Sequence, residues 1–376
     1  MMRKICYITG TRADFGLMQS TLELIDKAPG LELSLIVTGM HLLEEYGLTI
    51  QDIEAAGFKI AATVAVGAHS SGAAMGRNIG IMISGFIDAL ESARPDVVML
   101  LGDRGEMLAG AIAAIHLNIP IVHIHGGERS GTVDEPVRHA ISKLSHLHFT
   151  ATADARERLI RMGENPADVY VTGAPGLDGL TDMARATRTE LLEWAGLDPA
   201  RPFALMVYHP VLQEAEAAGK AAESILAAMA AGGVQIIALK PNSDAGSDGI
   251  RKVLEQHASD ANLRVFTHFP RARFVAWMAA ADVMVGNSSA GIIEAASFGT
   301  PVINIGSRQH LRERNANTVD VPTDETAISA ALVHALHQGR RPLQNVYGDG
   351  SAGLRILQLL SETDLNAAML AKSNAY

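Results

Sequence analysis

The sequence predicts an α/β protein made of two Rossmann-like domains with a central cleft. Short apolar segments rich in β-branched residues alternate with Ala-rich helical segments through most of its 376 residues. A turn-rich segment, G-A-P-G at 173–176, interrupts the alternation, and a second series of strands and helices follows it. A chain of this length also suits two domains better than one. We therefore expect an N-terminal domain over residues 1–173 and a C-terminal domain over residues 174–353.

The first domain is expected to hold a parallel sheet covered by helices on both faces, because its strand segments are apolar almost throughout. The expected strands span residues 4–9, 33–37, 60–66, 97–101, 121–125, 148–151 and 169–172. The expected helices between them span residues 17–28, 73–92, 106–117, 137–145 and 153–162.

The second domain repeats the pattern. Its expected strands span residues 203–208, 234–239, 263–267, 283–285 and 302–305, with helices such as 217–231 and 274–281 between them. Residues 354–371 are helical in pattern and are a candidate to pack back on the first domain, while residues 372–376 are expected to fray.

Composition limits the partners and the compartment. The net charge of −10 argues against nucleic acid or an anionic membrane as a partner. The single cysteine, Cys6, lies in a predicted strand and is expected to be a buried core residue, so no disulfide or Cys-based zinc site is expected within the chain. The apolar run near the N-terminus is too short for a signal peptide, and polar residues interrupt the longest uncharged stretch, 107–127. We expect a soluble cytoplasmic protein.

The segment 285–294 predicts a phosphate site. A strand ending at Val285 runs through Gly286 and Asn287 into Ser288 and Ser289, where a helix is expected to begin. Free amides at a helix N-terminus attract anions, and small residues allow close approach. Gly291 and Glu294 follow, and a carboxylate one turn into the helix can accept hydrogen bonds from ribose hydroxyls.

Three polar clusters follow strands of the first domain, at the edge where such sheets bind ligands. The first, residues 9–16, offers Arg12 to a phosphate, or is a plain turn with Asp14 as the helix cap. The second, residues 102–106, includes Asp103 and Arg104, which either act on a ligand or pair with each other as a structural contact; Asp103 as a helix cap is a further alternative.

The third cluster, residues 123–139, is the densest and contains His125, a double glycine, Asp134 and Glu135. Paired carboxylates beside histidine can supply an acid and a base. A zinc site fits the residue types but not the spacing, because no H-E-x-x-H or similar helical pair is present.

In the second domain, His209, Asn242 and Arg308 each lie just after a predicted strand. Asp244 is a candidate helix cap, and an exposed, unengaged side chain is the alternative for Arg308. No G-x-G-x-x-G fingerprint follows the first strand, which argues against a nicotinamide-dependent oxidoreductase. We therefore expect no cofactor and no metal.

Taken together, these segments resemble the hydrolysing UDP-N-acetylglucosamine 2-epimerases of the sialic acid branch. The resemblance covers nearly the whole chain. It rests on T-G-T-R-A-D-F-G (9–16), V-T-G-M-H (37–41), L-G-D-R-G-E (101–106), H-I-H-G-G-E (123–128), D-E-P-V-R-H-A-I-S-K (134–143), Y-H-P (208–210), P-N-S-D-A-G-S (241–247), G-N-S-S-A-G-I-I-E (286–294) and G-T-P-V-I-N-I-G-S-R-Q (299–309).

The resemblance implies the two-lobed GT-B type of fold and assigns roles to these residues. It implies catalysis or sugar contact for five of them: Asp103, His125, Asp134, Glu135 and His209. It implies UDP or substrate binding for the others: Arg12, Arg104, Asn242, Ser288, Ser289, Gly291, Glu294 and Arg308. Some branches of the family carry glutamate at the position of His125. Leu17 stands where non-hydrolysing relatives have lysine, which sides with the hydrolysing branch, and Asp248 stands where animal relatives have lysine.

The implied reaction is loss of UDP from UDP-N-acetylglucosamine by elimination, followed by rehydration to N-acetylmannosamine for sialic-acid-type synthesis. The same reaction on a 2,4-diacetamido-2,4,6-trideoxy sugar linked to UDP or GDP is the alternative. A GT-B glycosyltransferase and a non-catalytic nucleotide-sugar sensor are more distant ones. The contacts that select the sugar are expected in loops such as 68–78 and 128–133, and the protein is expected to be a homodimer or a dimer of dimers.

Overall fold

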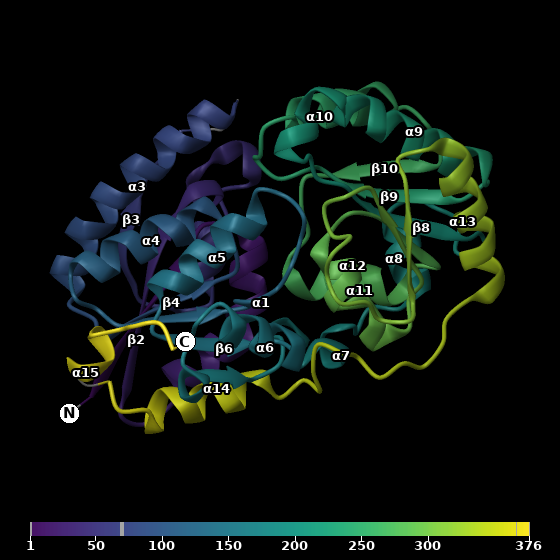
Figure 1. Ribbon diagram of the computed structural model, residues 1–376. Helices are drawn as coiled ribbons and strands as arrows, with labels where there is room; N and C mark the ends of the chain where they lie inside the picture. Colours follow the sequence, from purple (N-terminus) through teal and green to yellow (C-terminus); the bar gives the residue numbers. More distant parts are fainter. Residues whose placement is uncertain (1, 68–70, 366, 376) are drawn as a thin grey trace.

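Each of the two lobes is built on one parallel sheet (Figure 1). The structure, a computed structural model, describes residues 2–67, 71–365 and 367–375. The strand order is β3-β2-β1-β4-β5-β6-β7 in the first sheet and β10-β9-β8-β11-β12-β13 in the second. In both sheets the order reverses direction beside the first strand, which is where ligands bind in such folds. The predicted fold class is confirmed.

The first lobe follows the chain from β1 to β7. Its strands are β1 (Arg3–Thr9), β2 (Leu31–Thr38), β3 (Ile60–Val64), β4 (Val97–Leu101), β5 (Ile121–Ile124), β6 (Leu147–Thr150) and β7 (Val169–Val171). Its helices are α1 (Arg12–Asp26), α2 (Ile50–Ala55), α3 (Gly72–Ala93), α4 (Gly105–His116), α5 (Asp134–Leu144) and α6 (Ala153–Arg161).

The second lobe contains β8 (Phe203–Val207), β9 (Gln235–Leu239), β10 (Leu263–Phe266), β11 (Val283–Gly286), β12 (Val302–Ile305) and β13 (Thr318–Val321). Its helices, with those of the C-terminal segment, are α7 (Leu180–Met183), α8 (Arg188–Trp194), α9 (Ala218–Ala231), α10 (Ser247–Gln256), α11 (Arg271–Ala280), α12 (Ser289–Ile293), α13 (Glu325–Gln338), α14 (Ala352–Glu362) and α15 (Ala367–Leu370).

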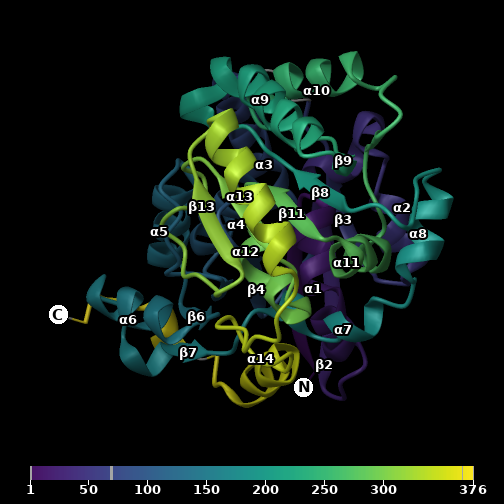
Figure 2. The ribbon, with the colours of Figure 1, turned by 90° about the vertical axis from the view of Figure 1, so that its right-hand side faces the viewer.

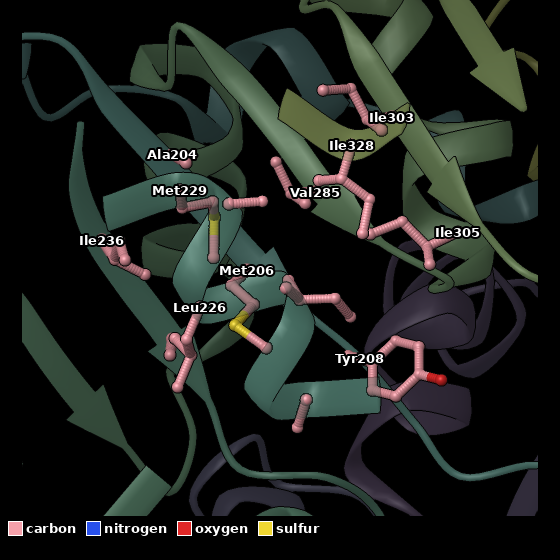
Figure 3. Packing of buried hydrophobic residues seen from close by; sticks show 14 of the residues in the cluster. Ala204, Met206, Tyr208, Leu226, Met229, Ile236, Val285, Ile303, Ile305 and Ile328 are labelled. Carbon is pink, nitrogen blue, oxygen red and sulfur yellow. The ribbon is translucent and has the colours of Figure 1, made fainter. Parts of the chain in front are cut away.

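Helices α9 and α13 cover one face of the second sheet, and Figure 2 shows α13 lying along it. Figure 3 shows the packing beneath them, where Met206 of β8 and Val285 of β11 meet Leu226 of α9 and Ile328 of α13. All four side chains are almost fully buried. Because such close-packed cores resist deformation, the strand ends that carry the polar clusters are held in fixed positions.

The C-terminal segment returns to the first lobe (Figure 1). Ile356 and Leu360 of α14 are buried in the core that contains β1 and α1. Asp178 anchors the start of α14, because its carboxylate accepts hydrogen bonds from the amides of Ala352 (2.9 Å) and Gly353 (2.5 Å). The helical segment that we expected to pack back therefore does so. The domain boundary at residues 173 and 174 remains a proposal.

The tail after α15 is anchored through Lys372, Asn374 and Ala375, so the expected fraying is wrong for these three residues; residue 376 lies outside the described residues. Lys372 Nζ donates to the carbonyls of Ser142 (3.0 Å), Lys143 (3.0 Å) and Ser145 (2.5 Å), and it lies 2.6 Å from a carboxylate oxygen of Glu164. A cation at the C-terminal end of α5 gives a charged donor to carbonyls of the last turn, where helical amide partners run out. The sequence offered only a polar tail, so this contact was not foreseen.

Most predicted elements lie within two or three residues of the observed ones, and the exceptions have physical causes. Helix α1 begins at Arg12 rather than residue 17, because Thr11 and Asp14 form a capping box at its start. Strand β13 was missed because its side chains are partly or fully exposed and it pairs only with β12. Among the described residues, no helix is long and apolar enough to cross a membrane.

Replacing Lys372 with methionine is expected to destabilise the protein by about 1–3 kcal/mol, because the α5 carbonyls lose a charged donor. Thermal unfolding monitored by circular dichroism measures the loss. Lys27→Met is the matched control, since the Lys27 side chain is exposed and its ion pair with Glu23, at 3.8 Å, lies on the surface. Equal unfolding temperatures for the two variants would show that the tail contributes nothing.

Candidate active site

A cavity of about 290 Å³ lies between the lobes, where the carboxyl ends of both sheets meet. The segments that follow β1, β4 and β5 line one side, and the segments that follow β8, β9, β11 and β12 line the other. The expected central cleft is therefore present, close in size to the smaller ligand pockets of proteins.

Eleven of the thirteen predicted site residues line this cavity. They are Arg12, Asp103, Arg104, His125, Asp134, His209, Asn242, Ser288, Ser289, Glu294 and Arg308. The functional roles assigned to them stay predictions, but their convergence from both ends of the chain is an observation.

Glu135 and Gly291 do not line the cavity. The Glu135 carboxylate accepts hydrogen bonds from the amides of Ser130 and Gly131, both at 2.9 Å, and so holds the turn before α5. These bonds help to keep its pKa below the usual range although burial acts the other way. Gly291 faces the second sheet, where an added Cβ would lie 3.0 Å from Val302. In this structure both residues support the site from outside.

Arg12 offers unused donors to the cavity. Arg12 is the first residue of α1. Its guanidinium lines the cavity and forms no hydrogen bond or ion pair within the described part of the chain. Burial lowers its pKa to about 10, while Asp52 acts in the opposite direction, so the side chain is a cation at neutral pH. The N-cap of α1 is Thr11, not Asp14 as the plainer interpretation expected; Asp14 is the third helical residue and completes the capping box with Thr11.

Asp103 pairs with arginines that the sequence did not single out. Its carboxylate accepts a hydrogen bond from Arg138 Nη2, and Arg312 of the other lobe lies 3.8 Å away. The structural pair expected between Asp103 and Arg104 is absent from the ion pairs of the described residues, and Asp103 is not the helix cap. Arg138 is fully buried and also donates to the carbonyl of Glu128 at 2.9 Å, so it ties two segments of the first lobe together.

Arg104 bridges the two lobes. It takes the N-cap position of α4, its Nε lies 3.3 Å from both carboxylate oxygens of Glu106, and its Nη2 lies 3.4 Å from Asp244. Burial disfavours the charged guanidinium, but the two carboxylates outweigh burial and raise the pKa of Arg104. Asp244 is not the expected helix cap, because Gly246 takes that position in α10.

His125 belongs to a chain of three charged or polar side chains. Its backbone is left-handed (φ +64°), its Nδ1 lies 2.5 Å from Glu128 Oε1, and the other oxygen of Glu128 pairs with Arg312 Nη1. Burial lowers the pKa of His125 to about 3, and Arg312 acts in the same direction. His125 is thus a neutral ring that carries one fixed hydrogen bond.

His209 is held by both its backbone and its ring. Asn287 bonds to the His209 amide and carbonyl, each at 2.8 Å, and the Asn242 amide donates to His209 Nδ1 at 3.2 Å. An Nδ1 that accepts places the proton of the neutral ring on Nε2. Burial is the main cause that keeps the pKa of His209 well below its usual range, and the positive charge of Arg308 is the second cause. The neutral ring can therefore donate from Nε2 to a ligand.

The predicted phosphate turn lies where the second sheet meets the cavity. Gly286 has φ +138°, and an added Cβ would lie 2.1 Å from the Val207 carbonyl oxygen, so only glycine fits there. Ser288 caps α12 by accepting a hydrogen bond from the Ala290 amide at 3.3 Å. Because α12 spans only Ser289–Ile293, a phosphate there would depend on nearby arginines more than on a long helix dipole.

Glu294 and Arg308 flank this turn. Glu294 is buried, with Oε2 2.6 Å from Arg271 Nη2. Arg308 donates to the Asn287 carbonyl at 3.1 Å, and its Nη2 lies 3.8 Å from Asp134 across the cleft. Arg308 is therefore not the exposed, unengaged side chain of the plainer interpretation.

His123, another histidine of the densest cluster, is structural. His123 engages Ser142 Oγ (2.9 Å) and the Gly102 carbonyl (2.7 Å) through its two ring nitrogens. Within the described ranges, no cluster of three or more His, Cys, Asp or Glu residues is arranged to hold a metal. Of the expected specificity loop 68–78, residues 72–78 form the start of α3, and 68–70 lie outside the described residues.

Several charged cavity residues were missed from the sequence, among them Glu128, Arg138, Arg271 and Arg312. Glu128 and Arg138 stand inside motifs that had already been quoted, so their charge next to candidate residues was an available signal. Arg271 and Arg312 lie in the segments that follow the predicted strands 263–267 and 302–305, but outside the motifs that were quoted. Only their contacts with residues distant in the sequence show that they belong to the site.

Known proteins share this architecture and sequence. A family model described as UDP-N-acetylglucosamine 2-epimerase matches residues 23–361. The chain belongs to the UDP-N-acetylglucosamine 2-epimerase family. A UDP-N,N'-diacetylbacillosamine 2-epimerase (hydrolyzing) from Legionella pneumophila is 48% identical over the whole of both chains. A UDP-N-acetylglucosamine 2-epimerase from Neisseria meningitidis is 37% identical, covering 93% of this chain and 92% of that protein.

A solved structure with UDP has the same fold. The S. aureus MnaA-UDP co-structure superposes with a TM-score of 0.81 at 20% identity, covering 96% of each chain. By the family model and these relatives, the UDP-N-acetylglucosamine 2-epimerase family is confirmed. The sialic acid branch is not, because the Legionella relative, named for a different sugar, has the higher identity.

Glu294→Ala is expected to weaken binding of UDP to this family member by about tenfold or more, because ribose hydroxyls lose a buried charged acceptor. Isothermal titration calorimetry with UDP measures the change. Glu223→Ala is a suitable control, since Glu223 is half exposed and pairs with His257 on the outer surface. Unchanged UDP affinity in Glu294→Ala would remove Glu294 from the nucleotide site.

Proposed function

We propose that this protein is a hydrolysing 2-epimerase of a UDP-linked 2,4-diacetamido-2,4,6-trideoxy sugar of the diacetylbacillosamine type. The observation that carries the proposal is a single cavity in which acidic side chains of one lobe face arginines of the other. The full-length 48% identity to the Legionella enzyme favours this sugar. UDP-N-acetylglucosamine, the first expectation from the sequence, becomes the second candidate, supported by the 37% identity to the Neisseria enzyme.

The first step is elimination. The C2 proton of the sugar is not adjacent to a ketone, so it leaves together with or after the bond between C1 and the diphosphate. A base takes the C2 proton, the C2–H electron pair forms the C1–C2 double bond, and the C1–O electron pair departs with UDP. Asp103, His125 and Asp134 are the candidate bases and acids in the first lobe.

The departing diphosphate carries the negative charge that develops in this step. Arg12 and Arg308 line the cavity from opposite lobes, and the Ser289 segment adds small residues and amides. Cations and amides positioned where charge builds up stabilise the transition state more than the ground state. His209 Nε2–H is a further donor beside them.

The second step is hydration of the resulting glycal. Water adds its oxygen at C1, and a proton reaches C2 from the face opposite to the one that lost it, which inverts C2 and releases the free 2-acetamido sugar. Base and acid must therefore stand on different sides of the ring. Asp134 is suited to act as the acid or the base. Its side chain is partly exposed, it lines the cavity, and its ion pair with Arg308 is loose, at 3.8 Å.

Family membership favours an epimerase over the two distant alternatives, a glycosyltransferase and a sensor. A transferase would need an acceptor, and a sensor would not need strand-end acids beside the nucleotide. The homodimer or dimer of dimers and the cytoplasmic location stay predictions.

A substrate panel tests the proposal. The protein is incubated separately with UDP-N,N'-diacetylbacillosamine, its GDP counterpart and UDP-N-acetylglucosamine, and free nucleotide and free sugar are quantified without any acceptor. The largest kcat/KM is expected for the UDP-diacetamido sugar, with a product inverted at C2. Binding without release, or release only when an acceptor is present, would contradict the proposal.

His209→Ala and Asp103→Asn are expected to reduce kcat by roughly 100- to 10,000-fold, as loss of a general acid, base or charge-stabilising donor does. UDP affinity should stay within about threefold, because both groups act at the sugar or the leaving bond. Steady-state kinetics and UDP calorimetry separate the two effects. Retained turnover in both variants would overturn the assignment.

A further inference from the structure

Glu128 has no role in the reaction described so far, although it lies in the cavity wall and is almost fully buried. Both carboxylate oxygens of Glu128 and its backbone carbonyl are engaged. Oε1 lies 2.5 Å from His125 Nδ1, Oε2 pairs with Arg312 of the other lobe, and the Glu128 carbonyl accepts from Arg138 at 2.9 Å. Glu128 is therefore in no position to accept a proton from the substrate itself.

His125 is presented to the cavity by this arrangement. Its left-handed backbone is unusual for a residue with a side chain, and such conformations persist where the surroundings fix them, often at functional sites. The His125 amide donates to the Phe149 carbonyl at 3.0 Å, and Glu128 holds the ring. Nε2 of His125 has no hydrogen-bond partner among the described residues, so it is the ring atom left for a ligand.

We propose that Glu128 is a positioning residue that fixes the tautomer and orientation of His125, so that His125 Nε2 is the base that removes the C2 proton. This inference rests on the proposed function. A carboxylate that accepts from Nδ1–H leaves a lone pair on Nε2 and stabilises the imidazolium that forms when Nε2 takes the proton. The C2–H electron pair enters the C1–C2 double bond, and the C1–O pair leaves with UDP.

Arg312 ties this pair to closure of the cleft. It comes from the segment after β12 in the second lobe, and it contacts Glu128 and Asp103 of the first lobe. Glu128 is thus oriented by an arginine that reaches it only when the lobes are together. The base is complete in the closed form, where water is excluded from the reacting carbons.

The same lobe contains a second buried His–Glu pair that provides a control. Glu164 lies 2.9 Å from His148 Nε2 and 2.7 Å from Lys143, and neither Glu164 nor His148 lines the cavity. Glu164→Gln therefore reproduces the loss of a buried carboxylate beside histidine without touching the reacting atoms.

The test compares Glu128→Gln with Glu164→Gln, using UDP-N,N'-diacetylbacillosamine with hydrogen or deuterium at C2. Glu128→Gln is expected to lower kcat about 100-fold, leave KM within about threefold, and enlarge the C2 isotope effect on kcat, because proton removal becomes slower. Glu164→Gln is expected to lower the unfolding temperature and leave kcat and the isotope effect unchanged. An unchanged isotope effect in Glu128→Gln would overturn the inference.

A double mutant tests whether Glu128 acts through His125. In a His125→Ala background, Glu128→Gln should cost less than about threefold in kcat, because the group it positions is gone. A further loss as large as in the wild-type background would overturn the inference. Should Glu128→Gln fail to fold, Glu128→Asp carries the test. It keeps the charge but moves it, so kcat should fall and the isotope effect rise, and an unchanged isotope effect would contradict the inference.

The inference and the proposed function fail in different ways. Wild-type protein that releases no UDP from any sugar in the panel would refute the proposed function. Active wild-type protein whose Glu128→Gln variant keeps its kcat would refute only the role of Glu128.

Discussion

Charge complementarity across the cleft is the interaction on which the site depends. The first lobe contributes the carboxylates of Asp103, Glu128 and Asp134, and the second contributes the guanidinium groups of Arg308 and Arg312. Each group is costly to bury without an opposite charge. Glu128 and Asp134 meet theirs in the other lobe, while Asp103 pairs with Arg138 of its own lobe and lies 3.8 Å from Arg312 across the cleft. The contacts that join the two lobes across the cleft therefore use the groups that the proposed chemistry needs.

The ion pairs across the cleft differ in strength, and this difference determines which of them a bound diphosphate would break first. Glu128 and Arg312 are almost fully buried and in direct contact, whereas Asp134 and Arg308 are 3.8 Å apart and partly exposed. A diphosphate entering the cavity competes best for Arg308, because the loose ion pair is the cheaper one to break. Its arrival would release the Asp134 carboxylate for the sugar while the His125–Glu128–Arg312 contact stays in place.

The sequence predicted the fold because its strands are apolar runs followed by polar clusters at one edge of each sheet, a pattern that needs no knowledge of distant contacts. It also placed most of the cavity lining, since parallel strands bring their carboxyl ends together. What it missed has a common cause. Arg312 and Arg138 matter through partners that are far away in the chain. Glu135 directly follows Asp134 but points away from the cavity, and its carboxylate accepts hydrogen bonds from the amides of residues 130 and 131. The reason is that neighbouring residues of a helix lie on different faces.

The central claim is that UDP leaves by elimination and that C2 exchanges its hydrogen within the closed cleft. The most direct measurement is turnover of UDP-N,N'-diacetylbacillosamine in D₂O, with the released sugar analysed by NMR and mass spectrometry. The account predicts one deuterium at C2 in every released molecule, with inverted configuration at that carbon. A released sugar that keeps hydrogen at C2 and its original configuration would mean simple hydrolysis at C1, and would contradict the account.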